Sequence, residues 1–106
     1  MKSYEISADN FNQHLKNKSL DGIIIDVREK VEWDYYHLEN SLLYPMNTIS
    51  EHLSELPKDK TLYILCAHGI RSQHVCQYLI HNGFDKVKNV NGGISAVSLL
   101  QGFQYD

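Results

Sequence analysis

Two apolar segments constrain the fold of this chain more than any other feature. They are DGIIIDV at 21–27 and TLYIL at 61–65. A run of β-branched and large aliphatic residues without polar alternation is typical of a strand that is buried on both faces. Both faces of a strand are buried when a parallel sheet lies between two layers of helices. The two segments therefore predict an α/β architecture.

The rest of the sequence alternates between strand and helix patterns. Short strands are expected at 4–6 and 86–90, and 37–46 is expected to be extended. Helices are expected at 8–17 with Ser7 as N-cap, 28–36, 47–56, 72–83 (with Val75, Cys76, Leu79 and Ile80 facing the core) and 94–101. This alternation predicts one domain over 1–106, with a mostly parallel central sheet of about five strands and helices on both faces.

The composition argues against several classes of function. Ten Lys and Arg residues stand against 13 Asp and Glu residues, so the net charge is −3 and offers no basic surface for nucleic acid. No apolar stretch reaches the ~18 residues of a membrane span, and the first residues lack the apolar core of a signal peptide. We therefore expect a cytoplasmic protein with reduced thiols, and neither nucleic acid nor a membrane as partner.

The segment CAHGIRS at 66–72 directly follows the second apolar run. Ligands bind at the carboxyl ends of the strands in open α/β sheets, so Cys66 is expected at such an end, facing the start of the next helix. Gly69 can adopt a positive φ that turns backbone N–H groups inward, and Arg71 and His68 add positive charge. These features favour the nucleophilic thiolate of cysteine and would hold an anion bonded to its sulfur, such as a persulfide.

The two cysteines have two other interpretations, as inert core residues or as zinc ligands. A lone cysteine at a strand end is commonly an inert core residue, but the neighbouring glycine and arginine favour a reactive Cys66. Zinc binding would need residues such as His74 and Cys76 to converge, and these lie about 200° apart around a helix. Cys76 is therefore interpreted as a core residue, and neither a metal nor another cofactor is expected.

Several motifs together resemble the rhodanese family. The segment Cys66-Ala67-His68-Gly69-Ile70-Arg71-Ser72 resembles the C-x-x-G-x-R-S active-site loop of that family. Asp26-Val27-Arg28, Glu32-Trp33 and His37-Leu38, leading to Pro45, resemble its D-x-R, E-aromatic and G-H-I segment. GFDKVKNVNGG at 83–93 resembles its closing G-[FY]-x-x-V-x-x-[LV]-x-G-G. The motifs occur in the family's order over nearly the whole chain.

The resemblance implies a single rhodanese-like domain with sulfurtransferase activity. Cys66 would take up sulfane sulfur as a persulfide from a donor such as thiosulfate and pass it to a thiol or to cyanide. The loop residues 67–72 would bind the persulfide. Ala67 is neutral where many thiosulfate-using members carry a cation, which predicts weak binding of thiosulfate.

Three charged residues outside the loop are expected to support it. Asp26, Arg28 and Glu32 follow the first apolar run, and a carboxylate from Asp26 or Glu32 is expected to orient Arg71. The alternative for Asp26 and Arg28 is a turn with a surface ion pair.

The alternatives to sulfur transfer by an enzyme are a phosphatase or arsenate reductase and a persulfide relay or binding module. Cell-division phosphatases of dual specificity and arsenate reductases have related folds, but they place five residues between cysteine and arginine. Here four residues intervene, which argues against phosphatase or arsenate reductase activity. A persulfide relay or binding module stays open, acting with a protein donor and a thioredoxin-like or other protein acceptor and with little thiosulfate activity.

Overall fold

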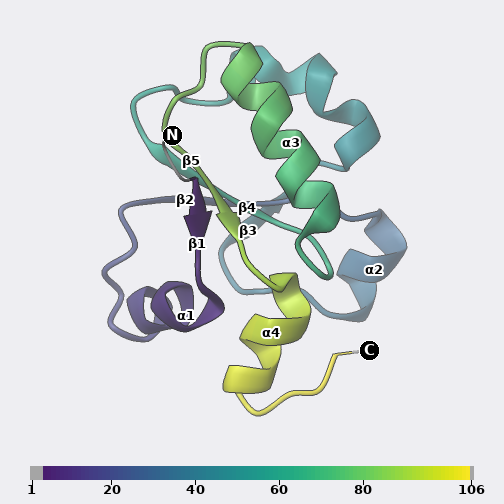
Figure 1. The fold of residues 1–106 in the computed structure, drawn as a ribbon. Helices are drawn as coiled ribbons and strands as arrows, with labels where there is room; N and C mark the ends of the chain where they lie inside the picture. The colour runs from purple at the N-terminus through teal and green to yellow at the C-terminus, as the bar shows by residue number, and fades with distance from the viewer. Residues whose placement is uncertain (1–3, 106) are drawn as a thin grey trace.

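Five strands form one sheet in the computed structural model of the chain, which describes residues 4–105. They are β1 (Glu5–Ile6), β2 (Gly22–Asp26), β3 (Ser41–Leu43), β4 (Thr61–Leu65) and β5 (Val87–Val90). All neighbouring strands pair in parallel, in the order β1-β5-β4-β2-β3 (Figure 1). The expected sheet is confirmed, and β4 lies at its centre.

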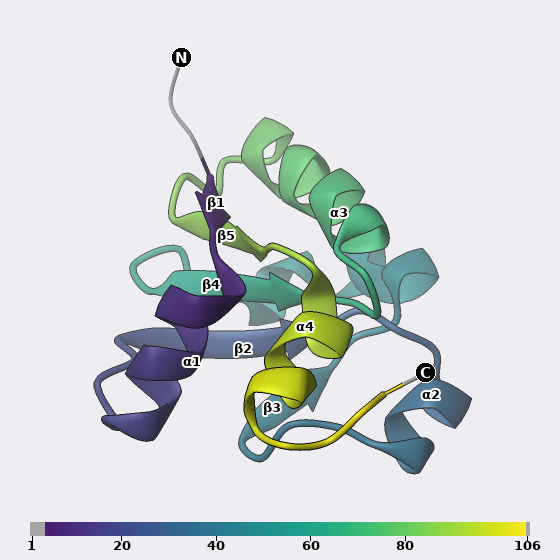
Figure 2. The same cartoon turned by 60° about the horizontal axis from the view of Figure 1, so that its bottom comes forward.

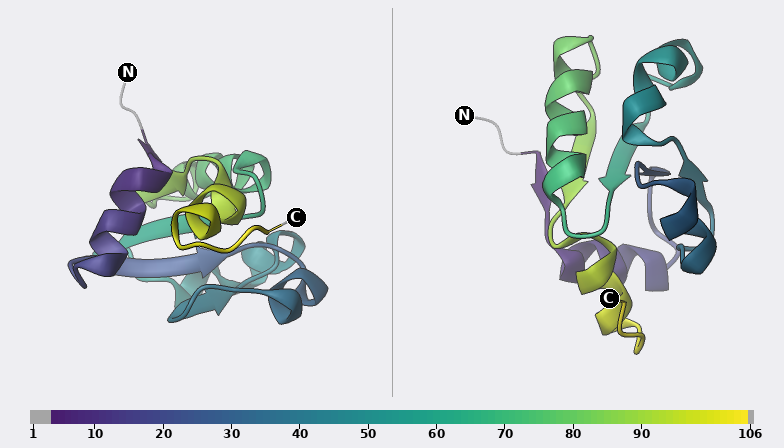
Figure 3. Two further views of the ribbon diagram at one scale, coloured as in Figure 1. Left: turned by 90° about the horizontal axis from the view of Figure 1, so that it is seen from below. Right: turned by 90° about the vertical axis from the view of Figure 1, so that its right-hand side faces the viewer.

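Helices cover both faces of this sheet, as predicted. They are α1 (Ala8–Lys16), α2 (Lys30–Tyr35), the 3₁₀ helix η1 (Met46–Glu55), α3 (Ile70–His81) and α4 (Gly93–Leu100). Helices α3 and η1 lie on one face, and α1 and α4 lie on the other (Figure 3). Helix α2 lies beyond the carboxyl end of β2 (Figure 2). None of the helices within residues 4–105 is long and apolar enough to cross a membrane.

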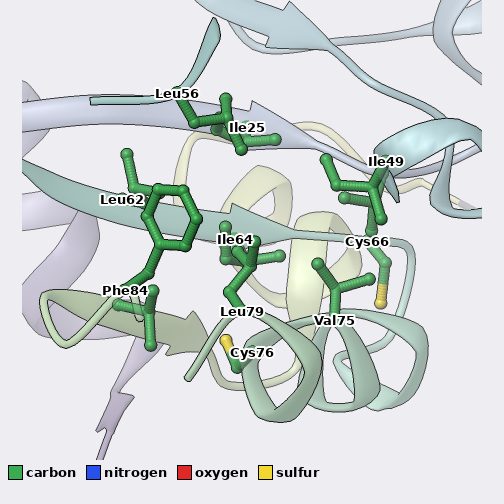
Figure 4. Packing of buried hydrophobic residues seen from close by; sticks show 12 residues of the cluster. Ile25, Ile49, Leu56, Leu62, Ile64, Cys66, Val75, Cys76, Leu79 and Phe84 are labelled. Atoms are coloured by element: carbon green, nitrogen blue, oxygen red, sulfur yellow. The ribbon is translucent and has the colours of Figure 1, made fainter. Parts of the chain in front are cut away.

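The two apolar runs contribute to both layers of the core. Ile25 and Ile64 belong to the cluster under α3 and η1, whereas Ile24 and Leu65 belong to the cluster under α1 and α4. Alternate side chains of a strand point to opposite faces, which explains why neither run shows a polar alternation. Figure 4 shows the first cluster, with Cys66 at the carboxyl end of β4.

Local signals account for where the helices begin. The Ser7 side chain caps α1 by accepting a hydrogen bond from the Asn10 backbone N–H at 3.1 Å, as expected. Helix α3 begins at Ile70, two residues before the predicted start, because Gly69 at its N-cap adopts φ +94° and turns the chain at once.

The prediction that Ile80 of α3 faces the core was wrong. Val75, Cys76 and Leu79 are buried, but the side chain of Ile80 is 42% exposed. Ile80 lies about 90° around the helix from the middle of the face that the other three share, so it points past the sheet toward solvent.

Candidate active site

The sulfur of Cys66 accepts two backbone hydrogen bonds from its own loop. The N–H of Gly69 donates to Sγ at 3.1 Å, and the N–H of Ser72 donates to it at 3.3 Å. The first N–H belongs to Gly69, whose positive φ turns the following chain into α3, and the second belongs to the first turn of α3. Cys66 is only 1% exposed, so these donors act where water does not compete. The arrangement suits a negatively charged sulfur.

A buried polar network lies behind this sulfur, and sequence reasoning missed its central residue. The Cys66 thiol lies 3.3 Å from the Ser72 hydroxyl, which donates in turn to the side-chain oxygen of Asn89 on β5. The Asn89 amide donates to the Gly69 carbonyl at 3.2 Å and to Glu5 at 3.0 Å. Asn89 thus links β5 to the loop at Gly69 and at Ser72. The only sequence signal was a polar residue in the otherwise apolar side of that strand.

Glu32 on α2 forms an ion pair with Arg71 on α3. The two terminal nitrogens of Arg71 donate to the two carboxylate oxygens of Glu32, both at 2.9 Å. The hydrogen bonds from the Arg71 guanidinium lower the pKa of Glu32 to about 2. Partial burial of Glu32 acts in the opposite direction, and the hydrogen bond from the Glu29 N–H lowers the pKa further. The hydrogen bonds from Arg71 to Glu32 also raise the pKa of Arg71. Of the two carboxylates considered for Arg71, the structure pairs it with Glu32.

Asp26 and Arg28 form a buried ion pair, so the surface ion pair considered for them was wrong. Both side chains are fully buried, and Arg28 Nη2 lies 2.7 Å from Asp26 Oδ2. Arg28 also donates to the Tyr36 carbonyl at 2.7 Å and to the Tyr105 hydroxyl at 3.1 Å. Burial by itself would lower the pKa of Arg28. The hydrogen bonds and the negative charge of Asp26 outweigh this effect, so the net result is a raised pKa. This pair fixes the turn after β2 that leads to Glu32.

The remaining loop and cysteine residues have contrasting surroundings. His68 and Ile70 are exposed, whereas Ala67 is buried. Cys76 is fully buried in the core cluster, and burial raises the pKa of its thiol to about 12. The interpretation of Cys76 as a core residue is confirmed.

Helix α4 packs its first turn directly on the loop. The N–H of Ile94 donates to the Cys66 carbonyl at 2.8 Å, and the N–H of Ser95 donates to the Ala67 carbonyl at 3.0 Å. A Cβ atom at Gly93 would lie 2.4 Å from the Cys66 carbonyl oxygen. A glycine is therefore required at this contact, within the segment that resembles the family's closing motif.

The comparisons with known proteins agree with this arrangement. Residues 7–99 match the sequence model of the rhodanese-like domain. The chain belongs to the rhodanese-like domain family. This rhodanese-like chain is 35% identical to a sulfurtransferase of Allochromatium vinosum over 87% of its own length and 85% of that protein. It is also 35% identical to a tRNA uridine(34) hydroxylase of Photorhabdus laumondii, of which it spans only 26%.

Solved structures confirm the rhodanese-like fold. A rhodanese-like domain protein from Staphylococcus aureus is 39% identical, with a TM-score of 0.81 and coverage of 92% of this chain and 91% of that one. A rhodanese-related protein from Thermoplasma volcanium is 28% identical, with a TM-score of 0.80 and coverage of 93% of both chains. The rhodanese-like architecture expected from the sequence is therefore the fold of this chain.

Proposed function

We propose that this rhodanese-like chain is a sulfurtransferase that carries sulfane sulfur as a persulfide on Cys66. The observation that carries the proposal is the position of the Cys66 sulfur, which follows the central strand and receives the N–H groups of Gly69 and Ser72 at 3.1 and 3.3 Å. The similarity to the Allochromatium vinosum sulfurtransferase supports it.

The proposed reaction has two steps that balance without a cofactor. The Cys66 thiolate attacks the outer sulfur of the donor, whose S–S bond breaks while the leaving group departs with the electron pair. With thiosulfate the leaving group is sulfite. An acceptor thiolate or cyanide then attacks the terminal sulfur of the Cys66 persulfide, and the Cys66 thiolate is regenerated. The backbone donors stabilise the charged sulfur through both steps.

The loop and its supports have separate roles in this proposal. Residues 67–72 surround the persulfide, and Arg28 and Asp26 stabilise the turn that brings Glu32 to Arg71. The acceptor is a small thiol or a thioredoxin-like or other protein thiol. A cytoplasmic location would keep such acceptors reduced.

The test is the mass of the intact protein after exposure to thiosulfate or to 2-hydroxyethyl persulfide. We expect a gain of one sulfur atom on Cys66, and we expect Cys66→Ser to lose both this gain and sulfur transfer. Cys76→Ala is the matched control. It should keep the activity and lose about 1 kcal/mol of stability, since it removes one small group from the core.

Two results would contradict the proposal. Full transfer by Cys66→Ser would remove Cys66 from the reaction. An equal loss in the Cys66 and Cys76 variants would instead indicate a two-cysteine redox mechanism.

A further inference from the structure

We infer that Glu32 determines the donor class of this loop: by neutralising Arg71, it makes the site select an alkyl persulfide, R–S–SH, over the thiosulfate dianion. The inference rests on the sulfurtransferase function proposed above and adds the substrate class to it.

The guanidinium groups of Arg71 and Arg28 are both paired with carboxylates. Arg71 is the one residue of the loop 66–72 with a permanent positive charge, and both of its terminal nitrogens contact Glu32 at 2.9 Å. Glu32 stays ionised at neutral pH, because its pKa is held near 2. Arg28 is fully buried and paired with Asp26 at 2.7 Å. The two guanidinium groups therefore leave no uncompensated charge for a donor.

The two donor classes place different charges on this loop. When the Cys66 thiolate meets thiosulfate, three negative charges come together, and sulfite leaves as a dianion. When the thiolate meets the alkyl persulfide, one negative charge is present if the donor is R–S–SH and two are present if its acidic terminal S–H has ionised, which is still fewer than with thiosulfate. With R–S–SH, the terminal sulfur then bonds to Sγ, its proton stays on it, and R–S⁻ leaves with the electron pair. Like charges repel unless a cation offsets them, so a loop with a neutralised Arg71 discriminates against the dianion.

The rest of the loop agrees with a donor of lower charge than thiosulfate. The backbone N–H groups of Gly69 and Ser72 supply partial positive charge at the sulfur itself, where both donors react.

The experiment compares the donors on three proteins. The value of kcat/KM is measured for thiosulfate, for 2-hydroxyethyl persulfide and for serum albumin carrying a persulfide, with the native chain, Glu32→Gln and Asp34→Asn. Glu32→Gln removes the negative charge but keeps a side-chain oxygen that can accept the hydrogen bond from the Glu29 N–H. In the native chain this hydrogen bond joins Glu29 N to Glu32 Oε1 at 3.0 Å. Asp34→Asn removes the same charge from the same helix, but Asp34 pairs with the exposed Lys30 at 2.9 Å.

We expect the native chain to prefer the alkyl persulfide. Glu32→Gln should raise the ratio of thiosulfate to persulfide kcat/KM about tenfold, equivalent to about 1.4 kcal/mol, through a lower KM for thiosulfate. This gain should shrink in high salt, since the freed guanidinium is partly exposed. Asp34→Asn should leave the ratio unchanged.

The outcomes separate this inference from the function on which it rests. If both donors place sulfur on Cys66 and Glu32→Gln leaves the ratio unchanged, the inference is overturned and the sulfurtransferase function stands. A native preference for thiosulfate would overturn it equally. Failure of every donor to place sulfur on Cys66 would overturn both. A faster reaction with the small persulfide than with the albumin persulfide would indicate a low-molecular-weight donor, and the reverse would indicate a protein donor; either order supports the persulfide class.

Discussion

The Glu32 side chain makes two interactions that matter for the structure. Its carboxylate accepts the Glu29 N–H at 3.0 Å, which completes the capping box at the start of α2, and it also holds both terminal nitrogens of Arg71. The position of α2 is thereby coupled to the first turn of α3, which supplies the N–H of Ser72 to the sulfur. At the scale of single residues, Glu32 therefore affects both the fold and the electrostatics of the site.

The first prediction at this scale is a pH dependence. The pKa of Glu32 is lowered from its usual 4.5 to about 2, so its ionised form stabilises the folded state. That contribution is fully present above about pH 4.5 and is lost as the pH falls toward 2. After allowance for partial exposure, we expect native protein to exceed Glu32→Gln by roughly 1–2 kcal/mol at pH 7. Urea unfolding of both proteins from pH 7 to pH 2 measures the difference.

The two unfolding curves should converge at the acid end of this range. A difference that persists unchanged at pH 2 would show that Glu32 acts through packing and not through its charge.

At the scale of elements, the contact between α4 and the loop leaves no room for a side chain at Gly93. Gly93 opens α4 with φ +62°, and its Cα lies so close to the loop that a Cβ would stand 2.4 Å from the Cys66 carbonyl oxygen. The N–H groups of Ile94 and Ser95 hold that carbonyl and the next one in place. Helix α4 therefore supports the loop from the side opposite to α3.

We predict that Gly93→Ala separates α4 from the loop. The added methyl group meets backbone atoms, which cannot rotate away as a side chain can. We expect a loss of roughly 2–4 kcal/mol in unfolding free energy and at least a tenfold loss of sulfur transfer.

Gly102→Ala is the matched control for this change. Gly102 also has a positive φ, +86°, but an added Cβ would meet nothing within 4 Å. It should cost about 1 kcal/mol from backbone strain and leave sulfur transfer intact. Equal effects of the two substitutions would mean that strain alone, and not the contact with the loop, explains the Gly93 result.

At the scale of the whole molecule, the end of the described chain closes over the turn after β2. Tyr105 is 9% exposed, its hydroxyl accepts a hydrogen bond from Arg28 at 3.1 Å, and its ring lies 5.4 Å from the centre of the Arg28 guanidinium. Figure 2 shows the final segment running from α4 toward α2. The stacked rings of Tyr36 and Phe103, 4.3 Å apart, hold this segment along the way.

We predict that Tyr105→Phe destabilises the protein by about 1.5–3 kcal/mol, because a buried charged donor loses an acceptor. Tyr35→Phe is the control, since the Tyr35 side chain is 64% exposed, and it should change stability by less than about 0.5 kcal/mol. Thermal unfolding of the two variants measures both values. A neutral Tyr105→Phe would show that the ring alone, and not the hydroxyl, closes the segment.

The sequence by itself determined the features that depend on neighbouring residues. The apolar runs at 21–27 and 61–65 predicted the central strands, because burial on two faces leaves no polar alternation. Ser7 marked the start of α1, and Gly69 marked the sharp turn before α3, because capping and positive φ are local backbone properties. The order of these elements was enough to indicate a parallel α/β sheet with Cys66 at a strand end.

Only the tertiary structure decided which distant groups meet. Glu32 and Arg71 are 39 positions apart in the sequence, and Arg28 and Tyr105 are 77 positions apart. Asn89 reaches Ser72 from the neighbouring strand, and no local pattern marked it as part of the site. Such pairs depend on the strand order, which places β5 and β2 on either side of β4. Local propensity determines where an element begins and ends. The charge balance around Cys66 depends on packing between elements that are far apart in the sequence.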